Sequence, residues 1–429
     1  MTATPGTTTP GETTPGTAQR VAVCVVATVA VVSVVSWRTG AIFDGSVDTV
    51  VIAKAVLAVV ALCGAVAVRM ASPLRFTLGM RSLLFLVLAV GVSMLGGIAS
   101  GHATATAVVG TRVALLAALV LTLLSCTPWR LVLGGFLGGM GAVAVVAAVT
   151  GVSSYAATGR LAGGIPEVQE NELAGLAALP LLALVTLMFR DGIRFRLVVP
   201  AVVLLSILWA TQSRTALLAL GLAVVIALFS APRLHWTAAV VVFASVPIGY
   251  AVLAFTSLFE DLVVRDQTAA EIASLSARTD AWKVVLDWDL LSWERWIGLG
   301  LSVKQIDVDL PFRDTQVFDS SWVSVLAQAG AIGLLLFAGW MLLTAIDVLR
   351  FRDGRFIMAP MLVLLVVRGL TENGLFDASS TFLVLFTIAV AAEPASQRVV
   401  SAAPATLSPF TRTPSRYITV PPTPQGATP

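Results

Sequence analysis

The sequence predicts an all-α polytopic membrane protein with about twelve transmembrane helices and a long extracytoplasmic loop between the ninth and the tenth. Of the 429 residues, 57% are hydrophobic and only 12% are charged, whereas a soluble domain carries roughly a quarter charged residues. Long apolar runs recur along the chain, and arginines concentrate in alternate connections between them. A chain this apolar cannot cover its surface with polar groups, so lipid must be part of its solvent.

Both ends of the chain have the composition of disordered cytoplasmic tails. Residues 1–19 are rich in Thr, Pro and Gly, a composition that offers no core. The segment lacks the basic start of a secretory signal, so the first apolar run is predicted to be a retained span. Residues 396–429 are rich in Pro, Thr and Ser and form the second predicted tail. The predicted membrane domain is therefore 20–395.

The predicted spans are runs of roughly 17–25 mostly apolar residues. They lie near 20–37, 49–68, 82–100, 104–126, 131–150, 172–189, 196–211, 214–230, 235–258, 321–346, 356–370 and 379–394.

Positive charge predicts the direction of these spans, because short connections rich in Lys and Arg stay in the cytoplasm. Five arginine-bearing connections fall on one side, which places both termini in the cytoplasm of a protein in the cell membrane. Long loops cross a membrane largely regardless of charge, so the two long outer loops, about 151–171 and 259–320, fit the same topology. The cytoplasmic arginines are Arg69, Arg75, Arg81, Arg130, Arg190, Arg194, Arg196, Arg233, Arg350, Arg352 and Arg355.

The larger outer loop contains a predicted amphipathic helix. Residues 271–297 place apolar groups at helical spacing and include four tryptophans, which suits a helix at the level of the lipid headgroups. Such a helix is either a plain interfacial anchor or the roof of a cavity, to which it offers Arg278 and Lys283. A turn at Gly298–Gly300 and a polar stretch up to Asp319 follow.

Several charged residues fall at or inside the predicted outer ends of the spans. Charges in hydrocarbon are costly and usually face a polar cavity or a partner. Simpler interpretations are that Lys54 extends its ammonium to the interface and that Arg368 and Glu372 pair with each other. The residues concerned are Arg214, Arg160 with the nearby Asn171 and Glu172, Arg368, Glu372 and Asp377, and, inside spans, Lys54 and Arg112.

Arginines that converge on an outer cavity favour a phosphate or diphosphate ligand, because guanidinium groups bind such oxygens in pairs. They could neutralise a departing diphosphate without a metal, while a carboxylate such as Asp319 takes a proton from an attacking hydroxyl. The alternative role for Asp319 is to cap the tenth span. The cysteines and histidines have no metal-ligand spacing, the two D-x-D triplets are weak signals, and the net charge of +3 does not suggest nucleic acid. No metal or cofactor is therefore predicted.

Four stretches resemble, in order, those of the O-antigen ligase and O-antigen or exopolysaccharide polymerase family of bacterial envelope glycosyltransferases. The likeness is clearest over 155–345. The stretches are Gly159–Gly163 continuing to Asn171–Ala174, then Gln212–Leu218, then Ala277–Trp282 leading to Trp296–Gly300, and finally Ser321–Gly330 with Ile332 and Gly333.

The resemblance implies transfer or polymerisation of a glycan from an undecaprenyl-diphosphate carrier to a hydroxyl of a glycan or lipid acceptor, at the outer face of the membrane and without a metal. It implies that Arg214 and Arg278 bind the diphosphate. The family's general base is a histidine before the span that follows the long loop, and this chain has Asp319 there, followed by Ser320. Catalytic roles are thus predicted for Asp319, Arg214 and Arg278. Substrate binding is predicted for Arg160, Asn171, Glu172, Lys283, Arg368 and Glu372.

Two other functions are compatible with the sequence. A multi-span solute or lipid transporter suits about twelve spans, although such folds show two similar halves and only the second half here has a long loop. A metal-dependent glycosyltransferase for lipid-linked sugars would use carboxylates of the first outer loop, Asp44 and Asp48. Loss of activity on changing either carboxylate would identify the second class.

Overall fold

The computed structural model describes residues 16–38, 48–230, 281–310 and 313–396. The helices are α1 (Thr17–Val34), α2 (Thr49–Ala71), α3 (Arg81–Ala99), α4 (Ala103–Leu124), α5 (Trp129–Thr150), α6 (Val152–Thr158), α7 (Glu170–Asp191), α8 (Phe195–Thr211), α9 (Arg214–Ser230), α13 (Trp293–Ile297), α14 (Ser321–Arg350), α15 (Arg355–Gly369) and α16 (Ser380–Ala392). Two antiparallel strands, β1 (Gln305–Leu310) and β2 (Arg313–Val317), form a hairpin.

The protein is a multi-pass membrane protein. Within the described ranges, seven helices are long and apolar enough to cross a membrane, and α8, α9 and α16 are shorter apolar helices. Helices occupy eleven of the twelve predicted span positions. The ninth, 235–258, lies outside the described residues, so the number twelve stays a prediction. The sides of the membrane on which the termini and loops lie also remain predictions.

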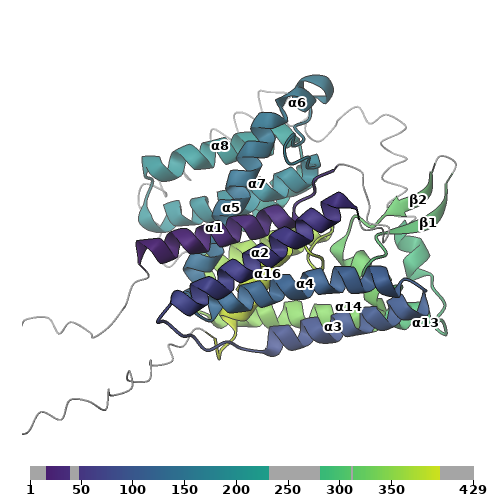
Figure 1. Ribbon diagram of the computed structural model, residues 1–429. Coiled ribbons are helices and arrows are strands. Elements are labelled where there is room, and N and C mark those ends of the chain that lie inside the picture. The colour runs from purple at the N-terminus through teal and green to yellow at the C-terminus, as the bar shows by residue number, and fades with distance from the viewer. Residues whose placement is uncertain (1–15, 39–47, 231–280, 311–312, 397–429) are drawn as a thin grey trace, which may run out of the picture.

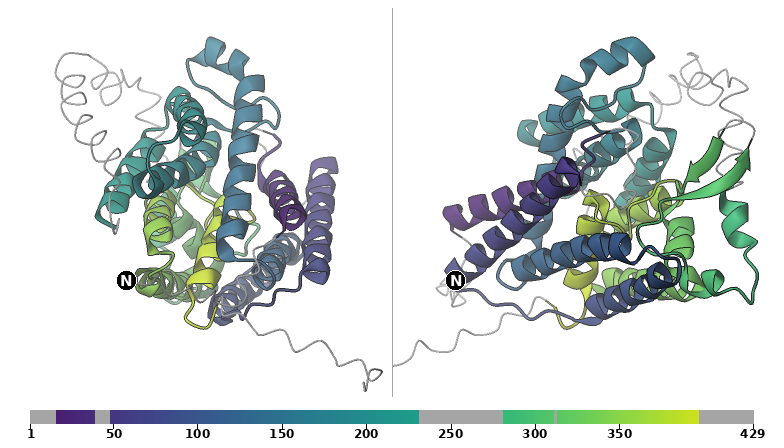
Figure 2. Two further views of the ribbon diagram at one scale, coloured as in Figure 1. Left: turned by 90° about the vertical axis from the view of Figure 1, so that its left-hand side faces the viewer. Right: turned by 45° about the vertical axis from the view of Figure 1, so that its right-hand side comes forward.

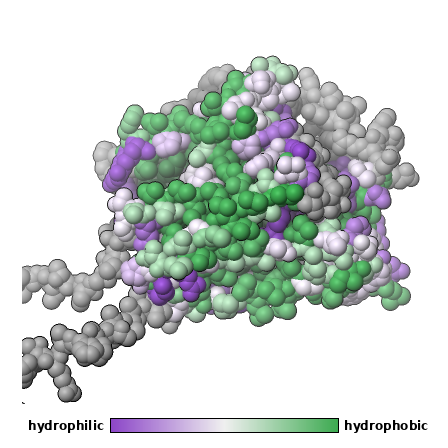
Figure 3. Space-filling view, viewed as in Figure 1, coloured by the Kyte–Doolittle hydropathy of each residue, from purple (hydrophilic) through white to green (hydrophobic). Residues whose placement is uncertain are grey.

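The long helices form a bundle with an apolar surface along its middle and more polar surface at its two ends. In Figure 1 most of the long helices run across the view, with α13, β1 and β2 gathered at the right-hand end. Figure 3 shows a mainly apolar surface over the same face, with hydrophilic patches toward its two ends. An apolar belt between polar ends is the surface expected of a bundle that spans a bilayer.

The short helix α16 lies at the centre of the bundle, and all of its thirteen residues are buried. It packs against α3, α4, α5, α14 and α15, and Figure 2 shows it (yellow) among the surrounding helices. Phe382 stacks on Phe386 with ring centroids 5.5 Å apart, and Trp340 of α14 meets Phe386 edge-on. A helix apolar on every side is stable here because protein rather than lipid surrounds it.

At the end opposite β1 and β2, Glu393 joins the end of α16 to the start of α3. Its carboxylate accepts hydrogen bonds from the backbone amides of Ser82 at 2.7 Å and Arg81 at 3.2 Å. Arg81 also pairs with Asp347 near the end of α14. A carboxylate on free amides satisfies the first turn of a helix and opposes the positive end of its dipole.

The prediction of one helix over 271–297 is wrong for its described part. Residues 281–286 are helical, a turn follows, and α13 begins anew at Trp293. Asp289 Oδ1 accepts a hydrogen bond from the Leu291 amide at 3.0 Å, and Ser292 Oγ accepts one from the Arg295 amide at 3.4 Å. These side chains bind backbone amides that a continuous helix would use, and Ser292 caps a new helix. The spacing of apolar residues does not reveal such local hydrogen bonds.

The polar stretch predicted after Gly300 contains the hairpin β1–β2, which the sequence analysis does not predict. Its first strand alternates polar and apolar residues, and Val308 is buried while Asp307 is exposed. That period of two is a strand signal. The segment between α13 and α14, predicted to lie on the outer side, therefore contains a small β-hairpin, whereas the other elements of the described residues are helices.

Candidate functional site

The connections predicted to lie outside the cell meet at one end of the bundle. Hydrogen bonds join the end of α1 to the start of α7, the α3–α4 turn to the segment after α13, and the start of α14 to the end of α15. An ion pair joins that same segment after α13 to the α15–α16 loop. Figure 2 shows the hairpin and α13 at this end. The predicted alternation of helix ends therefore brings these connections together.

The third and fourth stretches of the resemblance interlock here. Within α14 the helix is broken at Gly330, whose φ of 65° and ψ of −169° are non-helical. The break leaves carbonyl groups free, and the turn after α13 binds two of them. Leu299 N donates to Ala327 O at 2.8 Å, and Gly300 N donates to Gln328 O at 3.0 Å. The turn thus fills the gap in α14 with backbone hydrogen bonds, as buried backbone groups require.

Glycine at position 330 is required both by its conformation and by its surroundings. A φ of +65° is strained for any other residue, and a β-carbon there would collide with the backbone of Trp296 and Ile297. We expect Gly330→Ala to destabilise the protein by about 2 kcal/mol or more, measured by thermal unfolding in nanodiscs. Gly134→Ala is the matched control, since Gly134 of α5 has open space around its α-carbon. Equal unfolding temperatures for the two variants would contradict this prediction.

The first and second stretches also come together. Leu161 N donates to Ala210 O at 2.9 Å, and Arg160 Nε donates to Thr211 O at 3.4 Å. Gln212 then takes a left-handed conformation, with φ 52°, and the chain turns into α9. Arg214, partly buried, is the first residue of α9. Arg160 is therefore anchored beside the corner that positions Arg214.

Arg368 is buried beneath the start of α7. Its guanidinium donates to Asn171 O at 2.5 Å, and its Nε has no hydrogen-bond partner within the described part of the chain. Gly175 of α7 makes room for it, because a β-carbon there would collide with the guanidinium. Glu372 and Glu172 both attract Arg368 electrostatically. A buried arginine with spare donor capacity beside two carboxylates is suited to hold a polar substrate.

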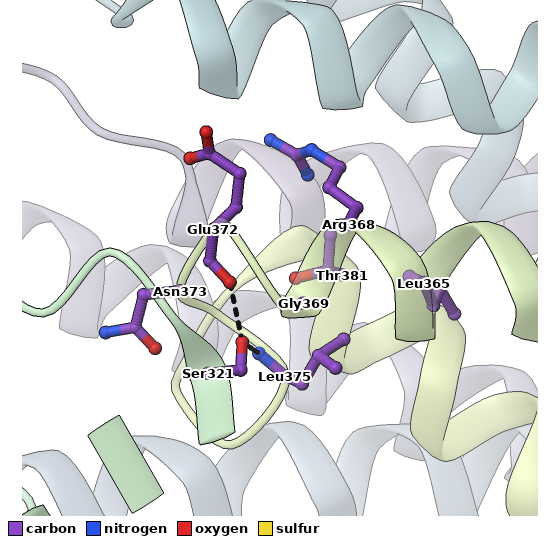
Figure 4. Close-up of a pocket in the computed structure, with 8 residues that line it drawn as sticks. All are labelled: Ser321, Leu365, Arg368, Gly369, Glu372, Asn373, Leu375 and Thr381. Atoms are coloured by element: carbon purple, nitrogen blue, oxygen red, sulfur yellow. Dashed lines mark hydrogen bonds between the residues drawn. The ribbon is translucent and has the colours of Figure 1, made fainter. Parts of the chain in front are cut away.

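A small recess opens beside Arg368. It holds about 180 Å³ of space, part of which is open to solvent, and is lined by residues of α14, α15, the α15–α16 loop and α16. Figure 4 shows Arg368 and Glu372 extending in the same direction, with Ser321, Asn373 and Leu375 on the loop side. Ser321 Oγ donates to Glu372 O at 2.8 Å and accepts from Leu375 N at 3.3 Å. The recess therefore has a rigid, hydrogen-bonded wall.

Asp319 immediately precedes this wall. The N-cap residue of α14 is Ser320, so the alternative prediction that Asp319 caps this helix is wrong. Ser320 Oγ donates to Gly369 O at 3.5 Å, and Phe318 N donates to Lys304 O at 3.1 Å. The Asp319 backbone is thus fixed between the end of α15 and the segment that carries Lys304, and its side chain is partly exposed.

Other predicted residues have different surroundings. Glu172 accepts hydrogen bonds from Ser36 N at 3.0 Å and Ser36 Oγ at 2.5 Å, so it ties α1 to α7. Asp48 caps α2 through Val51 N at 2.8 Å and pairs with Arg38 at 2.8 Å. Lys283 is exposed on the helical residues 281–286. Arg278 and Asp44 lie outside the described residues.

Lys304 forms an ion pair with Asp377 in the α15–α16 loop, with Nζ and Oδ2 2.6 Å apart. Burial raises the pKa of Asp377, but the ammonium of Lys304 and the guanidinium of Arg112 outweigh that effect and hold the pKa below its ordinary value. The pair therefore links the outer segment to the loop that lines the recess.

This ion pair predicts a pH-dependent stability. A depressed pKa in the folded state stabilises the protein at pH values above the ordinary Asp pKa of about 4, and that contribution is lost as the pH falls through the folded-state pKa. We expect Asp377→Asn to cost about 1–3 kcal/mol at pH 7 and the difference from the unmodified protein to shrink as the pH falls below about 4. Thermal unfolding across that range measures it, with Asp287→Asn on the exposed turn as control. A difference independent of pH would refute the assignment.

Comparison with known families identifies the domain that contains these elements. Residues 199–338 match the family model described as O-antigen ligase. The chain carries an O-antigen ligase domain. The family resemblance drawn from the sequence is thereby confirmed for this domain, and the chain is a membrane enzyme that contains it. No curated protein matches the chain.

The O-antigen ligase domain contains only part of the assembled end of the bundle. The match begins within α8 and ends within α14, so it includes Arg214, Arg278, Lys283 and Asp319. Arg160, Asn171, Glu172, Arg368 and Glu372 come from outside the matched residues, and the structure brings their segments to the same end of the bundle. The family match thus covers the positions of the predicted catalytic residues, and their roles stay predictions.

Sequence reasoning missed Lys304 and Gly175, whose segments meet at this end of the bundle. Lys304 lies in the long predicted loop 259–320, where a lysine carries no topological signal. Gly175 had no signal either, because its role depends on Arg368, which is 193 positions further along the chain.

Proposed function

We propose that this protein transfers or polymerises a glycan, taking it from an undecaprenyl-diphosphate carrier and passing it to an acceptor hydroxyl at the outer face of the membrane. The observation that carries the proposal is the match to the O-antigen ligase family, which includes Arg214, Arg278 and Asp319. Lipid-linked glycans are the substrates that this family membership implies.

The chemistry divides between the arginines and the carboxylate. The acceptor oxygen attacks the anomeric carbon, the bond from that carbon to the diphosphate oxygen breaks, and the bonding electrons leave with the diphosphate. Asp319 takes the proton of the acceptor hydroxyl. Arg214 and Arg278 stabilise the charge that develops on the diphosphate, which is the task of a preorganised cationic site.

The positions of neighbouring groups support these separate roles for the arginines and the carboxylate. Arg160 donates a hydrogen bond to Thr211 O, just before Arg214, and Asp319 adjoins the wall of the recess beside Arg368. The helix α9, which begins with Arg214, packs against α15, which ends beside Arg368. Arg160, Asn171, Glu172, Lys283, Arg368 and Glu372 are the groups that we propose to bind the glycan around the reacting bond.

The decisive experiment is a transfer assay with the purified full-length protein in nanodiscs. The donor is a synthetic oligosaccharide on undecaprenyl diphosphate, and products are detected by mass spectrometry with and without EDTA. We expect an extended or transferred glycan and free undecaprenyl diphosphate, in equal amounts with and without the chelator.

Two other outcomes would support the alternative functions. A product that disappears in EDTA, returns with magnesium and is lost on changing Asp44 or Asp48 would support the metal-dependent transferase. No product, together with movement of a solute across liposomes that contain the protein, would support the transporter.

A further inference from the structure

Two cations inside the membrane helices lie near each other, and the carboxylate that attracts both of them is already paired with a third cation. Lys54 of α2 and Arg112 of α4 are both partly buried, their helices pack together, and the two charges are close enough to repel. Neither side chain makes a hydrogen bond or ion pair with any of the residues that the structure describes. Like charges at this depth are costly, and membrane proteins usually keep them only where an anion or a polar ligand compensates.

The nearby carboxylates are already engaged by other groups. Asp377 Oδ2 accepts a hydrogen bond from Lys304 Nζ at 2.6 Å, and its Oδ1 accepts one from the Ala378 amide at 2.8 Å. Glu172 accepts hydrogen bonds from the backbone amide and the hydroxyl of Ser36, and Asp48 caps the start of α2. Of these three carboxylates, only Asp377 attracts all three cations, which are Lys54, Arg112 and Lys304.

The depth of Arg112 argues against simple extension of its side chain to water. It lies nine residues into α4, which is about 14 Å along the helix at 1.5 Å per residue. Lys54 lies only five residues into α2 and could reach the interface alone. Its position beside a second cation is then unexplained, because the ammonium would gain more by moving away from Arg112.

We propose that Lys54 and Arg112, backed by Lys304, form a binding site for a carboxylate or phosphate group on the glycan that this enzyme handles. The proposal rests on the function proposed above and adds a substrate class, namely glycans that carry an acidic sugar or a phosphate substituent. A guanidinium and an ammonium facing one oxyanion is a strong and geometrically selective arrangement.

The location favours the glycan over the carrier diphosphate. Arg214 begins α9, whose main neighbours are α7 and α15, whereas α2 and α4 pack mainly on each other, α1, α3 and α16. Figure 1 shows α2 and α4 on the opposite side of α1 and α5 from α8. An anion held by Lys54 and Arg112 is therefore displaced sideways from the proposed diphosphate ligand Arg214.

Ligand-dependent thermal unfolding tests the site without requiring glycan transfer, so it can fail independently of the proposed function. The full-length protein in nanodiscs is heated with sodium glucuronate, inorganic phosphate or glucose, at constant ionic strength made up with chloride. We expect glucuronate, phosphate or both to raise the unfolding temperature, because a ligand that binds only the folded state stabilises it, and we expect glucose to have no effect. The probe that acts identifies whether a carboxylate or a phosphate is the bound group.

The variants give the expected and the contrary results. Lys54→Gln and Arg112→Gln should each raise the dissociation constant of the active probe about tenfold or more, while Lys54→Arg should retain binding. Arg196→Gln, an exposed arginine at the opposite end of the bundle, is the matched control. The proposal is wrong if neither probe stabilises the unmodified protein, if the Gln variants respond as it does, or if Arg196→Gln weakens binding equally.

A second measurement separates the glycan from the carrier. Undecaprenyl diphosphate without sugar should stabilise the unmodified protein and Lys54→Gln to the same extent, because Arg214 remains in place. If Lys54→Gln loses that stabilisation, the cations belong to the diphosphate site and the assignment to the glycan is wrong.

Discussion

Arg214→Ala will lower glycan transfer by a factor of about 10²–10³ while leaving the protein folded, which is the loss expected when one preorganised charge opposite a leaving group is removed. Arg214 is the first residue of α9, at a corner fixed by the bond from Arg160 Nε to Thr211 O. The side chain therefore starts from a rigid position at the end of the bundle where the predicted outer connections meet. Its loss should affect the chemical step more than the fold.

The rate of product formation under saturating donor measures this effect. Arg196→Ala removes an arginine from the opposite end of the bundle, near the start of α8, and should transfer glycan at the normal rate. Arg214→Lys keeps the charge but loses the two-pronged guanidinium, so its rate should fall between those of the unmodified protein and the alanine variant. Transfer by Arg214→Ala at the normal rate would remove Arg214 from the mechanism.

Span positions were the most predictable property of this chain. The rule behind them is one-dimensional, because a helix that crosses lipid needs a long apolar run and satisfies its own backbone. The start of α9 was predicted at residue 214, where the structure places it, since Gln212, Ser213 and Arg214 interrupt the apolar pattern. α16 was harder to interpret correctly, because its apolar sequence is equally compatible with lipid contact and with the buried central position that it occupies.

The outer segment was less predictable because local side-chain bonds override its apolar period. Asp289 and Ser292 end one helix and start another. The turn at Gly298–Gly300 was recognised from its glycines, but its purpose depends on the break at Gly330. The turn supplies backbone amides, and the break in α14 supplies the carbonyl groups that accept from them. The two are far enough apart in the sequence that only the folded structure shows this match.

The candidate site was predicted as a set of residue types rather than as a geometry. The sequence indicated that Arg160, Arg214 and Arg368 lie at outer helix ends, and the structure places their segments at one end of the bundle. Their particular contacts depend on pairs far apart in the sequence, such as Gly175 with Arg368 and Ser36 with Glu172. With a single chain and no repeated pattern, nothing in the local sequence identifies such pairs.

Asp319→Asn will lower glycan transfer by a factor of about 10²–10⁴, the range for loss of a positioned general base. An amide matches the carboxylate in size but cannot take the proton of the acceptor hydroxyl. Because the amide keeps the shape of the carboxylate, the protein should stay folded. Single-turnover assays with bound donor measure the chemical step, and unfolding temperatures verify the fold.

Asp319→His distinguishes a proton acceptor from a residue that only shapes the site. Histidine is larger than aspartate but can accept a proton near neutral pH, and the family resemblance places a histidine base at this position. We therefore expect Asp319→His to transfer glycan measurably faster than Asp319→Asn, with Asp307→Asn on the exposed face of β1 unaffected. If the Asn variant keeps the full rate, the proton of the acceptor must leave by another route, and the recess beside Arg368 would lose its proposed connection to the chemical step.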